Sequence, residues 1–134
     1  MKIKQLFIIT ITFIGTSVIQ TTSSQEINPI EQAQQLIDQG NPEKAITILR
    51  KLQPKFEGIP AFDYVFGLAC VDTGRNAEAI FALERVIDTI PDHGPARAEL
   101  AKAYLALGET DDAKKQFEKV KELPDIPPEA QQTI

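Results

Sequence analysis

Few residues in this chain could do nucleophilic, acid–base or metal chemistry. It has one cysteine, Cys70, and one histidine, His93, far apart in the sequence. A catalytic nucleophile needs a neighbouring base, and a zinc site needs three or four ligands. There is no glycine-rich phosphate loop, and carboxylates on exposed helix faces are usually solvated. The sequence therefore predicts no enzyme activity, no cofactor and no metal site.

The surroundings of these two residues favour structural roles. Cys70 lies in an apolar run, which predicts a buried, unreactive thiol. His93 lies between Asp92 and Gly94 in a turn, which predicts a solvated loop residue. A single cysteine also leaves an exported chain without an internal disulfide.

The first 24 residues have the character of a secretory signal peptide. Lys2 and Lys4 precede an apolar run over residues 6–14, and a tail of small polar residues reaches Ser24. We therefore expect an exported protein. The alternative is a retained N-terminal anchor, although the apolar run, even extended to Ile19, is short of the roughly 20 residues that a membrane span needs.

The remaining chain is acidic. The formal net charge is -5, and removing two lysines with the leader leaves 12 basic and 19 acidic residues. Nucleic acids and anionic membrane surfaces attract basic patches. We therefore expect no nucleic acid partner, and membrane association only through a partner, a retained leader or a missing β-barrel.

Small residues recur at intervals of 34 residues, the period of a helix–turn–helix repeat. The recurring positions are Gly40, Gly74 and Gly108, together with Ala45, Ala79 and Ala113. Glycine at each hinge allows the positive φ that ends a helix, and the alanines allow two helices to cross closely. We expect Phe66, Leu83, Tyr104 and Phe117 to fill the space between the helices.

This pattern resembles the tetratricopeptide repeat family. The central unit carries the signature as Phe66-Gly67-x2-Cys70, Ala79-x3-Leu83 and Pro91, and the third as Leu100-Ala101-x2-Tyr104 and Ala113-x3-Phe117. The signature tryptophan is replaced by Asp63 and Arg97, and the first unit is more degenerate. The resemblance implies an all-α fold of antiparallel helix hairpins, a right-handed α-solenoid of three repeats.

The expected domain spans residues 25–123, with repeats at about 26–59, 60–93 and 94–124. Capping residues and prolines predict helices over about 29–39, 42–53, 61–73, 76–89, 95–107 and 110–122. The second helix is expected to stop before Pro54, followed by a loop over 55–60. Residues 124–134 are expected to begin a short capping helix or a longer continuation.

In this family the first helices of the repeats line a concave face that holds peptide segments, so the resemblance implies a non-enzymatic binding scaffold. Carried over by register, the partner-binding residues are Gln34, Tyr64, Leu68, Val71, Asp72, Lys102 and Leu105, with Ile30, Ile37, Asp38, Ala98 and Ala106 beside them. We expect Tyr64 and Lys102 to be accessible, and Lys102 to be the one cation of this face. The alternative is that Leu68, Val71 and Leu105 are covered by neighbouring units or further chain.

Residues 61–134 also resemble the periplasmic repeat region of surface lipoprotein assembly modifier-type outer-membrane proteins, in which a β-barrel comes after the repeats. That resemblance implies a location in the periplasm or at the periplasmic face of the outer membrane. The alternative function is therefore the recognition part of an outer-membrane protein or lipoprotein transport machine.

Overall fold

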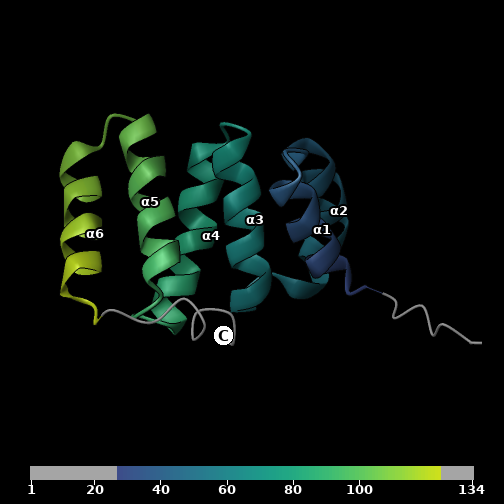
Figure 1. Ribbon diagram of the computed structural model, residues 1–134, viewed down its shortest axis with the longest axis horizontal. Coiled ribbons are helices and arrows are strands. Elements are labelled where there is room, and N and C mark those ends of the chain that lie inside the picture. The colour runs from purple at the N-terminus through teal and green to yellow at the C-terminus, as the bar shows by residue number, and fades with distance from the viewer. Residues whose placement is uncertain (1–26, 125–134) are drawn as a thin grey trace, which may run out of the picture.

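The computed structural model describes residues 27–124, which form a row of three antiparallel helix hairpins (Figure 1). The helices are α1 (Pro29–Asp38), α2 (Pro42–Phe56), α3 (Pro60–Asp72), α4 (Asn76–Thr89), α5 (Gly94–Ala106) and α6 (Thr110–Glu122). Within this range there is no strand. The predicted all-α class of helical repeat is confirmed. The predicted signal peptide and the residues from 125 onward lie outside the described range.

The helices fall into two sets, which we call the inner helices (α1, α3 and α5) and the outer helices (α2, α4 and α6). Each helix packs against the next along the chain, and α3 also packs against both α1 and α5. Among these six helices, α2 does not pack against α4 in this way, nor does α4 pack against α6, although Arg50 on α2 and Glu78 on α4 form an ion pair at 2.8 Å. The inner helices therefore form one packed layer, and the outer helices lie on the other side.

Glycine ends the inner helices in the same way in all three repeats. Gly40, Gly74 and Gly108 have φ values of 74°, 73° and 80°, in the left-handed region that costs other residues energy. After Gly74, the Arg75 N–H donates to the Cys70 carbonyl oxygen at 2.7 Å, which closes the last helical turn. The predicted hinge role of the three glycines is confirmed.

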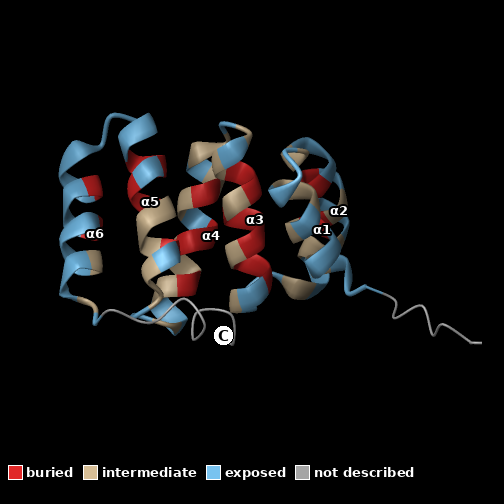
Figure 2. Ribbon diagram, in the orientation of Figure 1, coloured by how far each residue is buried: buried red, intermediate tan, exposed pale blue. Residues whose placement is uncertain are grey.

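The core lies between the helices and is densest around α3 (Figure 2). The recurring alanines, including Ala45, Ala79 and Ala113, are buried as expected, and Cys70 is fully buried. Small residues at these positions let neighbouring helices approach, so large side chains can fill the remaining space.

Phe117 departs from its predicted role as a core residue. The residues 34 and 68 positions earlier, Leu83 and Leu49, are both 0% exposed, whereas Phe117 is 38% exposed. Outer helices α2 and α4 are each covered by the next inner helix, but no helix in the described range comes after α6. Gln116 is buried there instead. The prediction failed because burial at this position depends on a further inner helix.

The prediction that the second helix stops before Pro54 was wrong. Helix α2 continues to Phe56 with Pro54 inside it, and the Glu57 N–H still donates to the Gln53 carbonyl oxygen at 3.0 Å. Proline removes one backbone donor and disturbs the preceding turn. Pro54 is exposed in the last turn, where the helix is already ending, so the helix tolerates it. With 15 residues, α2 is not a shortened helix.

None of the helices described between residues 27 and 124 is both long enough and apolar enough to cross a membrane.

Candidate peptide-binding face

The predicted binding residues lie on all three inner helices. Gln34 lies on α1, Lys102 and Leu105 lie on α5, and the other four, Tyr64, Leu68, Val71 and Asp72, lie on α3. Helix α3 separates α1 from α5, so Gln34 and Lys102 lie on helices that do not contact one another. We call the surface formed by these seven residues the inner face. Its centre is α3.

The seven residues differ in how far their side chains are exposed to a partner. Asp72, Lys102 and Leu105 are exposed, and Leu105 exposes 48% of its surface. Gln34, Tyr64, Leu68 and Val71 are half-buried, and both Tyr64 and Val71 pack against the core. Leu105 and part of Leu68 are therefore the apolar surface that this face offers, while Val71 mainly supports the core.

Tyr64 is not the freely accessible residue that the sequence predicted. Its ring packs against the His93 ring, with the ring centroids 4.7 Å apart. The prediction of a solvated His93 was also wrong, because this residue is half-buried and its Nδ1 accepts a hydrogen bond from the Ala96 N–H at 3.0 Å. His93 thereby caps α5, and burial lowers its pKa. Sequence reasoning missed this role because histidine is an uncommon cap.

The charges on the inner face are mainly acidic. Lys102 Nζ donates to Glu99 Oε1 at 2.6 Å, so the expected lone cation already has an anionic partner. Glu99 was missed, although its spacing of three residues from Lys102 on one helix signals such a pair. Asp38 accepts a hydrogen bond from the Gln34 amide at 2.9 Å. Carboxylates of all three inner helices, Asp38, Asp72 and Glu99, thus contribute to this face.

The pKa shifts of two residues, Tyr64 and Asp72, show that these carboxylates act on the same region. Burial raises the pKa of Tyr64, and the negative charges of Glu99 and Asp38 raise it further. Burial also raises the pKa of Asp72, with a further increase from Glu99 that Lys102 opposes. The face therefore combines apolar side chains with an excess of negative charge.

The one cysteine of the chain is not placed for nucleophilic chemistry. Burial raises the pKa of the Cys70 thiol to about 12, so the sulfur stays protonated and is a poor nucleophile. Among residues 27–124 there is no cluster of three histidine, cysteine, aspartate or glutamate side chains that could hold a metal ion.

The fold and this face define a tetratricopeptide-like helical repeat protein. The family described as Tetratricopeptide repeat matches residues 71–132, from the end of α3 onward. Repeats of this family generally mediate protein–protein interactions and are typically non-enzymatic scaffolds. No curated protein matches the chain.

Proposed function

We propose that this protein is a non-enzymatic scaffold of the cell envelope that binds a protein segment along its inner face. One observation carries the proposal: α1, α3 and α5 form a connected layer that presents exposed Leu105 and half-buried Leu68 beside carboxylates. Apolar side chains supply affinity when a partner covers them, and surrounding charges select the partner.

The charges favour a partner with lysine or arginine beside an apolar residue. Asp38, Asp72 and Glu99 outnumber Lys102, which is already paired at 2.6 Å. An acidic segment would be repelled, whereas a basic one would be attracted at long range. Because Lys102 is already paired with Glu99, it is not well placed to meet a partner carboxylate.

The test compares two peptides that differ only in charge. A peptide with two lysines flanking a leucine should bind the purified protein, and the same peptide with glutamates should not. Replacing Asp38 and Asp72 by asparagine should lower the affinity for the lysine peptide roughly threefold per charge removed, and added salt should lower it further. Equal binding of both peptides, or no effect of these substitutions, would contradict the proposal.

The envelope location rests on the leader-like sequence of residues 1–24. When the protein is expressed in a Gram-negative host, we expect to recover it from the periplasm in a form that lacks roughly the first 24 residues. Intact-mass analysis tests this, and a membrane-bound product that retains Met1 to Ser24 would refute it.

A second candidate function is recognition within an outer-membrane protein or lipoprotein transport machine. It is favoured by the sequence resemblance of residues 61–134 to the repeat region of assembly modifier-type proteins. Under this function the segment bound by the inner face belongs to an outer-membrane protein or lipoprotein. Crosslinking in cells, with identification of the crosslinked product, would separate this function from a general scaffold.

A further inference from the structure

A buried ion pair connects the two helices of the central repeat. Asp63 is 0% exposed, and its two carboxylate oxygens accept hydrogen bonds from Arg85 at 2.8 and 2.9 Å. The Gly58 N–H donates to the same carboxylate at 3.0 Å, and Glu57 lies 3.4 Å from Arg85. Two carboxylates thus surround one guanidinium between the start of α3 and the middle of α4.

The third repeat carries different charges at the equivalent positions. Adding the 34-residue period replaces Asp63 by Arg97, Arg85 by Lys119 and Glu57 by Pro91. Both carboxylates are therefore lost, and two cations occupy the positions of the ion pair. Like charges held close together destabilise each other unless anions compensate them.

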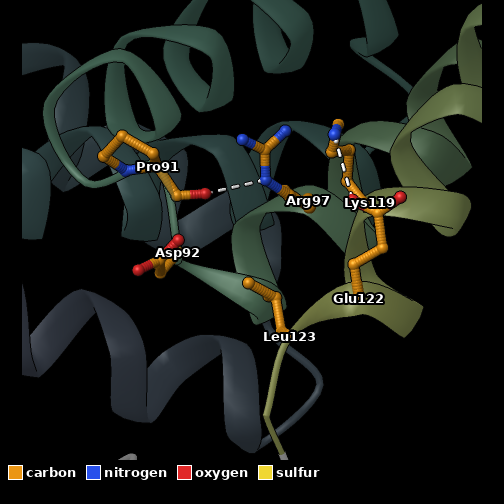
Figure 3. A pocket seen from close by; sticks show the side chains of 6 residues that line it. All are labelled: Pro91, Asp92, Arg97, Lys119, Glu122 and Leu123. Atoms are coloured by element: carbon orange, nitrogen blue, oxygen red, sulfur yellow. Dashed lines mark hydrogen bonds and ion pairs between the residues drawn. The ribbon is translucent and has the colours of Figure 1, made fainter.

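These cations line a pocket of about 360 Å³ between the α4–α5 turn and the end of α6 (Figure 3). The lining residues are Pro91, Asp92, Arg97, Lys119, Glu122 and Leu123. In Figure 3 the charged ends of Arg97 and Lys119 lie on one side, while Asp92 and Leu123 lie on the other. The volume is at the lower end of the range of pockets that bind small molecules, and it is large enough to admit one carboxylate side chain.

Among the described residues, Arg97 has neutral hydrogen-bond partners and no anionic one. Its Nε donates to the Pro91 carbonyl oxygen at 2.8 Å, and its Nη1 donates to the Gln116 amide oxygen at 2.7 Å. Within residues 27–124 no carboxylate forms an ion pair with this half-buried guanidinium. An arginine held in place by neutral acceptors is well arranged to receive a carboxylate.

Neither of the two acidic residues of the pocket is a firmly held partner of its cations. Glu122 pairs with Lys119 at 3.0 Å, but both side chains are more than half exposed, and such surface pairs contribute little to stability. Asp92 is exposed and pairs with neither cation. An incoming carboxylate can therefore displace Glu122 from Lys119 at small cost.

We propose that the pocket between Arg97 and Lys119 binds a carboxylate group of a partner protein, placed as Asp63 is placed beside Arg85. The group is an aspartate or glutamate side chain or a free chain end. This site differs from the inner face in location and in the charge it selects, so it would contact a separate part of the partner.

The experiment monitors the Arg97 Nε–H signal by NMR during titration with three small probes. N-acetyl-glutamate amide supplies a side-chain carboxylate, N-acetyl-alanine supplies a terminal carboxylate, and N-acetyl-glutamine amide supplies neither. We expect saturable shifts with one or both acids and none with the amide. A shift that sodium chloride reproduces at equal ionic strength, or equal shifts with all three probes, would overturn the proposal.

Substitutions test whether both cations are required. Lys119→Gln should weaken the affinity for the acid probe at least fivefold. Lys115 is an exposed lysine of α6 that does not line the pocket, so Lys115→Gln should leave this affinity unchanged. Arg97→Asp should place a carboxylate of the protein itself beside Lys119, as Asp63 lies beside Arg85, and so abolish binding of the probe. Probe binding to all three variants is followed through the backbone amide signals of residues 92–98. Probe affinity unchanged by Lys119→Gln or by Arg97→Asp would overturn the proposal.

Discussion

Gly67 on α3 faces Leu83 on α4 so closely that a Cβ atom added to the glycine would lie 2.6 Å from Leu83 Cγ and 2.7 Å from Cδ2. Real Cβ atoms essentially never approach so near. Helices α3 and α4 therefore pack at this distance only because position 67 has no side chain, and Leu83 fills the space that the glycine leaves.

Gly67→Ala should therefore destabilise the protein. Overpacking typically costs about 1–3 kcal/mol, and the better helix propensity of alanine returns roughly 1 kcal/mol at most. Urea denaturation measures the difference. Gly94→Ala is the matched control, because the added Cβ would meet only the end of the Leu123 side chain at 3.3 Å. Equal stabilities of the two variants would show that the helix crossing is misassigned.

Asp63→Ala should be among the most destabilising single changes. It leaves the Gly58 N–H and Arg85 without their buried partner, and breaking such a pair costs about 3–5 kcal/mol. Arg85 is one-third exposed and can regain some hydration, so we expect about 3 kcal/mol, the lower end.

Glu57→Gln is the control for this pair. Glu57 also contacts Arg85, at 3.4 Å, but its side chain is 47% exposed, so the loss should stay below about 1 kcal/mol. Similar losses for the two variants in thermal or urea melts would show that Asp63 contributes only as a surface charge.

His93 should make stability depend on pH near neutrality. Burial lowers its folded-state pKa below the ordinary value of 6.5, and protonation removes the Nδ1 acceptor that caps α5. A lowered folded-state pKa means that this contribution is complete above pH 6.5. It is lost as the pH falls below 6.5 and through the folded-state value, by at most about 1.4 kcal/mol per pH unit.

The comparison uses urea melts of the wild type and of His93→Asn at pH 7.5 and 5.5. Asparagine caps helices well but does not titrate, so the variant should lose less stability between the two pH values. An identical loss in both proteins would assign the pH dependence to carboxylates elsewhere.

The repeat register was predictable because it depends on local geometry. Gly74 and Ala79 are small for reasons that act within one hairpin, so their spacing gave the fold, and α4 and α6 have the predicted bounds. Phe117 was predicted wrongly because its burial depends on a further helix packed against α6. The seven residues carried over by register lie on α1, α3 and α5, but the register did not predict how their side chains pair.

Several side-chain contacts within the repeats were not predicted from the sequence. Asp63 was recognised only as a departure from the signature tryptophan, because its partner Arg85 is 22 residues away and on another helix. Lys102 was predicted to be the one cation of that face and is exposed as expected, but its partner Glu99 had been given no role there. His93 was placed in solvent because the turn residues around it do not reveal the Tyr64 ring that packs on it.

The central claim is that the inner face binds the partner segment, and site-specific photocrosslinking tests it most directly. A photoreactive phenylalanine analogue replaces Leu105 on the inner helix α5 or Phe81 on the outer helix α4, two apolar residues that are 48% and 65% exposed. With the lysine-flanked leucine peptide, we predict crosslinking from position 105, its suppression by excess unlabelled peptide, and none from position 81. Crosslinking from position 81 and not from 105 would contradict the claim and place binding on the outer helices.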